Sequence, residues 1–441
     1  MRRGLSRHNN RSGGNYFNPL SLFAGGVQGV WYDDSLTSSM YQDSAGTIPA
    51  ALESPVGKQL DLSGNNNHRT QATSANRPTL SARYNLLTKT EDFSDAAWIV
   101  TACTKSGTTV GTVVALGPTS TRRNITELFT IPSAGTWKVS FLLTNISQRY
   151  VQIYFGGVVA VAFACTFDLT GAGAVSNIGG AIGAISLNLN GTYSCSMVFT
   201  TVAGEATNVV IAFVDTSNAV RAASSTSTGS FSISKPDFRA SNQSTGLIPT
   251  YQYVDTSSVY DTAGFPQYIK YNGSNTYLVT AAVNFSSTAQ IVVFSGIRKL
   301  ANYGGIVDAS YSGNLNTFLL LASGIATELN SYSFLSKGTV LALAEPPVAI
   351  YTPPITNVLT GLGNISAPSV TLRINGAQVS SSTATQGTGN FSNLPLYFGS
   401  RQLVAPFLNG QEFQTIIVGK LLTTAEITAT ETYVNSKTKA Y

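Results

Sequence analysis

Pairs of acidic residues could support glycoside hydrolysis, which uses two carboxylates about 5–9.5 Å apart. On a β-strand such a pair must occupy alternate positions, because successive side chains point to opposite faces. The adjacent pairs Asp33-Asp34 and Glu91-Asp92 therefore point their side chains apart, and no Glu-x-Asp-x-x-Glu run occurs. The acidic residues thus disfavour hydrolysis, and we expect no enzymatic activity.

Histidine and cysteine are too few and too dispersed for other common chemistry. A Ser-His-Asp hydrolase needs a histidine with partners, but the chain has only His8 and His68 and no evident Gly-x-Ser-x-Gly elbow. We interpret His68 as a turn or packing residue. Two histidines with Cys103, Cys165 and Cys195 do not make a zinc site. Cys165 and Cys195 lie in apolar alternating runs, which predicts buried thiols; a Cys165–Cys195 bridge is the alternative.

The stretch 58–80 organises the chain around a predicted turn. Leu60 and Leu62 alternate with polar residues, and the run breaks at 63–67, Ser-Gly-Asn-Asn-Asn. Glycine and asparagine tolerate positive φ, so we predict a tight turn between strands. Asp61 and Asn65–Asn67 could also offer oxygens to Ca²⁺. Because asparagine-rich turns are commoner than calcium loops, the turn is preferred, Ca²⁺ is the alternative, and no other cofactor is expected.

Composition indicates an all-β protein. Of the 441 residues, 43% are hydrophobic, enough to bury cores, while only 11% are charged, against about 25% in an average soluble protein. The length predicts about two or three domains. Thr423 and Glu426 form a capping-box pattern that predicts one short C-terminal helix, to about Asn435. Clean alternation predicts strands at 137–143, 150–155 and 209–214.

Short motifs on both sides of the middle third resemble one family. The run Asp61-x-Ser-Gly-Asn-x-Asn-His68 is similar to the early hairpin of concanavalin A-like (laminin G-type) sandwiches. The succession of runs at 267–274, 370–376, 395–401 and 412–418 resembles the second half of that sandwich. The resemblance implies a split concanavalin A-like sandwich with its first part at 29–83 and its second part at 247–441.

The middle third resembles a second family. The run 85–98, together with 166–171 and 191–199, is similar to jelly-roll modules of the carbohydrate-binding type. This implies an inserted jelly roll at 84–246, so the predicted fold is all-β with two β-sandwiches. The resemblance nominates Trp98 and Trp137 as glycan-binding residues, with a place in the core as the alternative.

The first 28 residues look like an arm. They cannot build a core by themselves, and they begin with basic residues and continue with aromatic and aliphatic ones. We predict an extended arm, 1–28, that docks to another protein; the alternative is that it packs on its own domain. The predicted docking residues are Arg2, Arg3, Arg7, Arg11, Tyr16, Phe17, Leu22 and Phe23.

Charge and hydropathy exclude two classes of partner. The net charge of +5 is partly local to the arm, whereas a nucleic-acid binder usually spreads its basic residues over one face, so no nucleic acid is expected. The N-terminus has no apolar signal core, and no run of about 18 apolar residues occurs. We therefore expect neither secretion nor membrane insertion.

The order of arm, split lectin-like sandwich and inserted jelly roll resembles bacteriophage virion proteins. It implies a fibre or tail appendage, made in the host bacterial cytoplasm and located in the virion. Other virion proteins are the expected partners through the arm, host-surface polysaccharide is a candidate ligand, and a homo-oligomer is expected. The alternatives are a capsid-decorating or head-fibre protein, a polysaccharide-degrading enzyme and a lectin-like bacterial surface protein.

Overall fold

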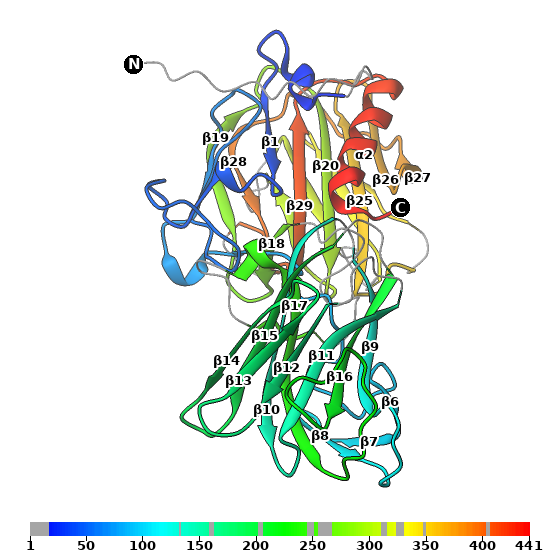
Figure 1. The fold of residues 1–441 in the computed structure, drawn as a ribbon. Helices are drawn as coiled ribbons and strands as arrows, with labels where there is room; N and C mark the ends of the chain where they lie inside the picture. The colour runs from blue at the N-terminus through cyan, green and yellow to red at the C-terminus, as the bar shows by residue number, and fades with distance from the viewer. Residues whose placement is uncertain are drawn as a thin grey trace. The chain divides into compact units, whose positions relative to one another are not determined.

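The computed structural model of the protein describes residues 17–131, 134–157, 163–201, 206–244, 251–254, 267–309, 315–322, 330–346, 350–402 and 406–441 (Figure 1). Its regular elements are antiparallel strands, four short 3-10 helices and one α-helix, so the predicted all-β fold with a short C-terminal helix is confirmed. No helix in these ranges is long and apolar enough to span a membrane. The 3-10 helices are η1 (Pro19–Phe23), η2 (Thr37–Ser39), η3 (Ser74–Asn76) and η4 (Ser241–Ser244).

The chain folds as two compact units. Unit 1 contains the described residues of 1–50, 55–78 and 268–441, and unit 2 contains those of 51–54 and 79–267. The predicted domain bounds, 1–28, 29–83, 84–246 and 247–441, stay predictions.

Unit 1 is built on two antiparallel sheets. The first has the order β27-β26-β25-β20-β29-β18, with β1 also paired to β29. The second has the order β2-β3-β4-β19-β28-β21-β22-β23-β24. In chain order these strands are β1 (Gly29–Asp33), β2 (Met40–Tyr41), β3 (Lys58–Gln59), β4 (Arg69–Thr70), β18 (Tyr268–Asn272), β19 (Leu278–Asn284), β20 (Gln290–Lys299), β21 (Gly305–Asp308), β22 (Thr317–Leu321), β23 (Ser333–Lys337), β24 (Leu341–Ala344), β25 (Ile355–Asn364), β26 (Ser369–Ile374), β27 (Ala377–Ser382), β28 (Asn393–Phe398) and β29 (Asn409–Val418).

Strands from the first 70 residues complete both sheets of unit 1. Val30 of β1 pairs with Ile417 of β29, and Thr70 of β4 pairs with Val279 of β19. Segments more than 200 residues apart therefore share one sheet, as a split sandwich requires.

Helix α2 (Thr424–Thr438) covers one face of the first sheet of unit 1 (Figure 1). The predicted capping box is present, because the Thr423 side chain accepts from the Glu426 amide and the Glu426 side chain accepts from the Thr423 amide. Val434 of the helix packs with Val292, Phe294 and Val418 of the sheet. Gly296 permits this approach, since a Cβ there would lie 1.9 Å from the Thr438 hydroxyl.

Unit 2 is a sandwich of two antiparallel sheets. Their orders are β14-β15-β10-β17-β8-β7 and β13-β12-β11-β16-β9-β6. Beside them, Leu80 of β5 exchanges backbone hydrogen bonds with residues 53 and 54. The strands of the unit are β5 (Thr79–Ser81), β6 (Ile99–Thr101), β7 (Cys103–Ser106), β8 (Val110–Ala115), β9 (Asn124–Thr130), β10 (Gly135–Asn145), β11 (Tyr150–Gly157), β12 (Ala164–Asp168), β13 (Ala174–Ile178), β14 (Ile182–Leu187), β15 (Tyr193–Thr201), β16 (Ala206–Val214) and β17 (Ser230–Ala240).

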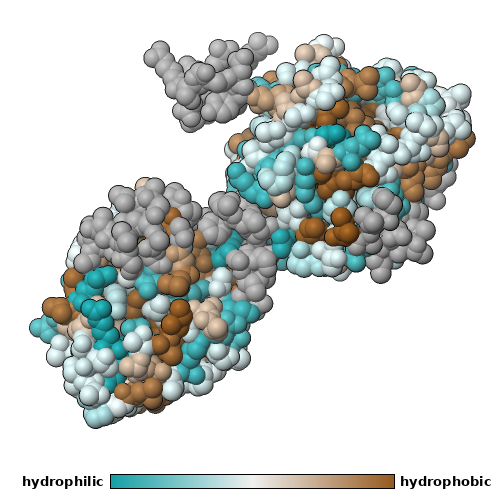
Figure 2. Space-filling view, turned by 90° about the vertical axis from the view of Figure 1, so that its right-hand side faces the viewer, coloured by the Kyte–Doolittle hydropathy of each residue, from teal (hydrophilic) through white to brown (hydrophobic). Residues whose placement is uncertain are grey.

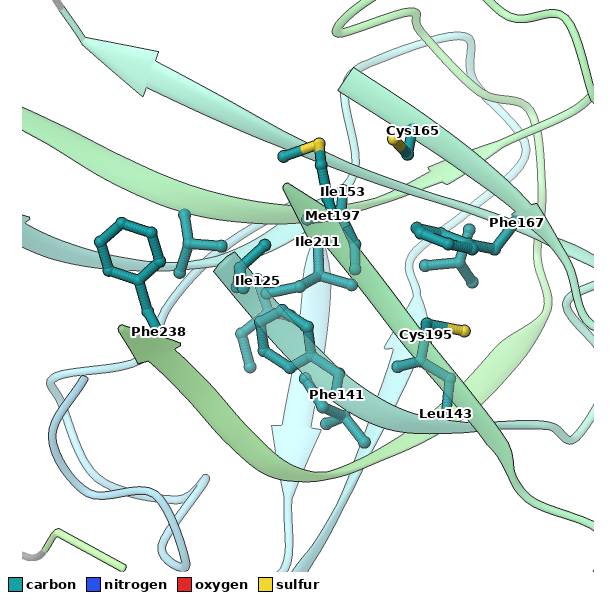
Figure 3. Packing of buried hydrophobic residues seen from close by; sticks show 14 of the residues in the cluster. Ile125, Phe141, Leu143, Ile153, Cys165, Phe167, Cys195, Met197, Ile211 and Phe238 are labelled. Atoms are coloured by element: carbon teal, nitrogen blue, oxygen red, sulfur yellow. The ribbon is translucent and has the colours of Figure 1, made fainter. Parts of the chain in front are cut away.

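Alternate residues of both sheets fill the core of unit 2 (Figure 3). Phe141 and Leu143 of β10 meet Ile153 of β11 and Ile211 of β16 there, as period-2 alternation predicts. Cys165 and Cys195 are buried and both free, as predicted. Burial raises the pKa of the Cys165 thiol to about 12, so these thiols behave as small apolar side chains.

Candidate functional site

A hollow of about 360 Å³ lies on one sheet of unit 2. Ligand pockets are commonly about 300–1,000 Å³, so this one suits a small molecule or one part of a longer chain. Its lining comes from β10, β14, β15, β17 and the segment that begins at residue 251. The lining residues are Lys138, Ser140, Phe141, Leu142, Ala184, Ile185, Ser186, Ser194, Cys195, Ser196, Lys235, Asp237, Arg239 and Tyr251.

Strand alternation on β10 builds the floor of the hollow. Val139, Phe141 and Leu143 are buried in the core of unit 2, so Lys138 and Ser140, between them, face away from it. Register aligns these outward residues with outward serines and basic residues of the neighbouring strands. Lys138 is opposite Arg239, Ser140 is opposite Ser196 and Asp237, and Leu142 is opposite Ser194 and Ser234.

A β-bulge on β17 reverses which residues of that strand face the hollow. Ser140 pairs with Asp237 while Leu142 pairs with Ser234, so Lys235 and Pro236 together oppose one residue of β10. Before the bulge, Phe231 and Ile233 enter the core; after it, Phe238 does. The extra residue thus turns Asp237 and Arg239 toward the hollow, where uninterrupted alternation would direct them into the core.

Asp237 and Arg239 form a buried ion pair at one end of the hollow. Nε and Nη2 of Arg239 donate to the two carboxylate oxygens of Asp237, and the backbone N–H of Gln252 donates to Oδ2 at 2.9 Å. Burial raises the pKa of Asp237, while the hydrogen bond and charge of Arg239 oppose the rise. The Arg239 guanidinium also lies 4.4 Å from the centre of the Tyr84 ring, which fixes its plane.

Serines and one tyrosine supply the remaining polar atoms. Ser140, Ser194 and Ser196 are half-buried, and Ser186 on β14 is exposed. Tyr251 shares a hydrogen bond of 2.8 Å with Thr90 Oγ1, which holds its ring beside the hollow. A concave, hydroxyl-rich surface with an aromatic ring can bind a polyhydroxylated ligand, because it offers donors, acceptors and an apolar contact together.

The hollow contains one carboxylate among its lining residues, and that carboxylate is engaged by Arg239 and Gln252. Within the described ranges no cluster of three or more histidine, cysteine or acidic side chains could hold a metal ion. The chemistry that the lining can perform is therefore hydrogen bonding and charge pairing.

Trp98 and Trp137 lie elsewhere than the sequence resemblance nominated. Their side chains are 0% and 5% exposed and belong to the core of unit 2. The Trp98 Nε1–H donates to the Lys89 carbonyl at 3.0 Å, and the Trp137 ring stacks on Phe238 at 5.4 Å. Neither ring offers a face to a ligand in this structure, so the alternative, a place in the core, describes them.

The predicted docking residues divide into two groups. Arg2, Arg3, Arg7, Arg11 and Tyr16 lie outside the described residues. Phe17, Leu22 and Phe23 pack on unit 1, with Leu22 and Phe23 only 1% and 6% exposed in its core. This second group follows the alternative in which the segment packs on its own domain, because η1 directs these side chains onto the sheet and α2.

The Asn-rich turn works as a structural clamp. The Asp61 carboxylate accepts from the amides of Trp31, Ser63 and Asn67 and from the Ser63 hydroxyl, at 2.7–3.0 Å. The side-chain amides of Asn65 and Asn67 donate to the Gly29 carbonyl at 3.1 and 2.9 Å. His68 Nδ1 accepts from the Asp61 amide at 3.0 Å, which agrees with its interpretation as a turn residue. Donors thus engage both oxygens of the carboxylate that could have served Ca²⁺.

Sequence reasoning missed Lys138, Lys235, Asp237, Arg239 and Tyr251. The alternation at 137–143 was visible, and its outward residues were the available signal for Lys138 and Ser140. The run from Phe231 was expected to end at Pro236, whereas β17 continues to Ala240 through the bulge. Nothing in the letters marks such a bulge, so Asp237 and Arg239 could not be assigned a face.

Comparisons with known proteins give structural likenesses alone. No family model and no curated protein matches the chain. Similar solved structures include a heptameric SAP-like pentraxin from Limulus polyphemus, with 13% identity, 36% of this chain and 78% of that chain covered and a TM-score of 0.30. Another is the CBM40 of the Ruminococcus gnavus IT-sialidase bound to α2,3-sialyllactose, at 14%, 33%, 83% and 0.27 in the same order. A third is the binding domain of Paraclostridial Mosquitocidal Protein 1, at 17%, 38%, 43% and 0.31.

The chain therefore covers most of the first two structures but less than half of the third. Because identities are 13–17% and TM-scores are near 0.3, these likenesses carry no argument about this chain. The all-β fold rests on the strands described above, and the phage origin stays a prediction.

Proposed function

We propose that the chain is a saccharide-binding structural protein of a bacteriophage particle, carried as a fibre or tail appendage. The hollow on β10, β14, β15 and β17 is the observation that supports saccharide binding. The assignment to a virion is supported by the order of sequence motifs, which resembles that of phage proteins.

The lining favours binding over cleavage of the saccharide. Hydrolysis needs one carboxyl group as acid and a second as base or nucleophile. In the hollow, Asp237 is held by Arg239 and by the Gln252 amide, and it has no carboxylate neighbour among the lining residues. The serine hydroxyls, in contrast, suit the hydroxyls of a sugar.

A glycan array read with the full chain tests the saccharide proposal. Ser196→Trp places a large ring inside the hollow, and we expect it to weaken binding of any array ligand at least tenfold. Thr200→Trp is the matched control, because Thr200 lies on the same strand, is exposed and does not line the hollow. Equal loss with both variants, or no loss with either, contradicts the assignment of the hollow.

Particle analysis tests the virion proposal. We expect mass spectrometry of purified phage particles to detect the chain, and immunogold labelling to place it on the tail. Labelling of the head would instead support the capsid-decorating alternative. Absence of the chain from purified particles contradicts both.

A further inference from the structure

Basic side chains outnumber acidic ones around the hollow. Lys138, Lys235 and Arg239 line it, against Asp237 alone. Because the bidentate pair with Arg239 occupies the Asp237 charge, the two lysines supply the uncompensated positive charge. In the described part of the chain, neither lysine ammonium forms an ion pair.

The positions of the two lysines let them act on one ligand. Lys138 is half-buried on β10 opposite Arg239, and its charge lowers the pKa of Asp237 against the stronger effect of burial. Lys235 is exposed on the bulge of β17. Both therefore project from the sheet that forms the floor of the hollow.

The backbone at Lys235 is strained. Its φ is +50°, a conformation that non-glycine residues rarely adopt, and Pro236 follows it. Such strain persists only where the surrounding structure holds it, and it gathers at binding sites. Bulges also re-aim side chains. The strained bulge keeps a positive charge at the edge of the hollow and turns the Asp237–Arg239 pair toward it.

We propose that the hollow takes an anionic saccharide unit, one that carries a carboxylate or a sulfate group, with Lys138 and Lys235 pairing with that group. This inference rests on the proposed saccharide binding and specifies its ligand class. The serine hydroxyls contact the sugar hydroxyls, and the Tyr251 ring contacts an apolar face of the sugar. Arg239 positions Asp237 and adds to the positive potential.

Paired glycans test the ligand class. The full chain is titrated on an array in which each uronic-acid or sialic-acid oligosaccharide is paired with its carboxyl methyl ester, and each sulfated one with its unsulfated parent. We expect the anionic members to bind and esterification or desulfation to weaken binding at least about tenfold, the effect of one charged hydrogen bond. The carboxylate and sulfate pairs show which anion the hollow takes. Raising NaCl from about 50 to about 500 mM should weaken the same interactions.

Three variants locate the effect. Lys138→Ala and Lys235→Gly should each lower affinity for the anionic members about tenfold and leave any residual affinity for neutral members unchanged. Lys235→Gly suits the test because glycine accepts the positive φ, so loss of binding cannot be attributed to misfolding. Arg149→Ala is the control: it removes the same charge beside β11, on the other sheet, where the Arg149 side chain is 57% exposed.

The outcomes separate the two proposals. If charged and neutral members bind equally and the lysine variants match wild type, the saccharide proposal stands and the anionic ligand class is wrong. If no glycan of either class binds, both proposals fail. If Arg149→Ala weakens binding as much as the lysine variants do, the effect is one of net charge and the assignment to the hollow is overturned.

Discussion

Arg69 and Glu412, which are 343 positions apart in the chain, form a fully buried ion pair inside unit 1. Nη1 of Arg69 on β4 donates to both carboxylate oxygens of Glu412 on β29, at 2.8 and 2.9 Å. Nη2 of the same guanidinium donates to Asp34 at 3.2 Å, and the group lies 4.4 Å from the centre of the Tyr32 ring. The pair therefore joins the two sheets of unit 1, one strand from each, across the residues that separate them in sequence.

The buried charges around Arg69 depend on one another. Burial raises the pKa of Asp34 well above its ordinary value, and the negative charge of Glu412 raises it further, while Arg69 opposes both. The Tyr271 hydroxyl donates to Glu412 at 2.8 Å and the Gln59 amide donates to Asp34 at 2.9 Å. Removing the single cation leaves two carboxyl groups without compensation.

Arg69→Leu should lower the free energy of unfolding of unit 1 by about 3–5 kcal/mol, because it leaves buried acids unpaired. Hydrogen–deuterium exchange of peptides from β29 measures the loss locally. The control is Lys420→Ala, which breaks a partly exposed ion pair with Glu426 at 3.5 Å and should cost at most about 1 kcal/mol. Equal protection of β29 in wild type and Arg69→Leu would contradict the prediction.

Glu127 of β9 should make the stability of unit 2 depend on pH. Its carboxylate is buried and accepts from the Thr88 amide and hydroxyl at 2.6 Å, while its Oε2 has no hydrogen-bond partner in the described residues. Burial raises its pKa to about 8, from an ordinary value of 4.5. Between these values the folded state holds a proton that the unfolded chain has released, so stability falls as pH rises, by up to about 1.4 kcal/mol per pH unit.

Glu127→Gln should remove that dependence, since the amide stays neutral and its oxygen can still accept from Thr88. The measurement is the free energy of unfolding between about pH 5 and 8.5, followed by tryptophan fluorescence in a Trp31→Phe background. The two remaining tryptophans, Trp98 and Trp137, both report on unit 2. Parallel pH curves for the background protein with and without Glu127→Gln would show that this carboxyl does not titrate as expected.

Local patterns predicted local structure well. The capping box at Thr423 and Glu426 and the strand alternation at 137–143 are both found in the structure, because each depends on neighbours within a few residues. The turn at 63–67 also forms. Its asparagines, however, clamp β1 through Gly29, a contact across more than 30 residues that spacing alone does not reveal.

Long-range placement was the part that sequence could not supply. Arg69 follows a polar turn, where an arginine is ordinarily exposed, and its burial depends on Glu412 and Asp34 reaching it from distant strands. The surfaces of the molecule mix hydrophilic and hydrophobic residues (Figure 2), so hydropathy alone does not mark the hollow either. The site emerged only once register aligned β10 with β15 and β17.

Trp98 should contribute to stability and not to ligand binding. Its ring is buried against Phe93, with centroids 5.2 Å apart, and it does not line the hollow. Trp98→Ala should therefore cost about 3–5 kcal/mol, and Trp98→Phe clearly less, in thermal or urea unfolding. Saccharide binding by the folded Trp98→Phe protein should equal that of wild type. A variant that keeps its melting temperature but loses binding would restore the role that the jelly-roll resemblance nominated.

Two truncations separate docking from folding at the N-terminus. Removing residues 1–16 takes away the four arm arginines but leaves Leu22 and Phe23 in the core of unit 1. We expect this protein to keep the melting temperature of wild type. Removing 1–28 also deletes both core side chains, each of which contributes about 1.5–3 kcal/mol on burial, so it should lower the free energy of unfolding by several kcal/mol. The structure thus revises the expectation that the whole segment can be deleted without effect on the fold.

Only the shorter truncation can test attachment to a particle, because it changes the arm without changing the core. If residues 1–16 dock the chain, phage assembled with the shorter protein should lack it, as measured by mass spectrometry of purified particles. The matched control replaces Arg2, Arg3, Arg7 and Arg11 with glutamine, which keeps the length and removes the charge. Loss with the truncation alone assigns docking to Tyr16 and the backbone of the arm, and loss with both assigns it to the arginines. Normal incorporation of both proteins would contradict docking through this segment.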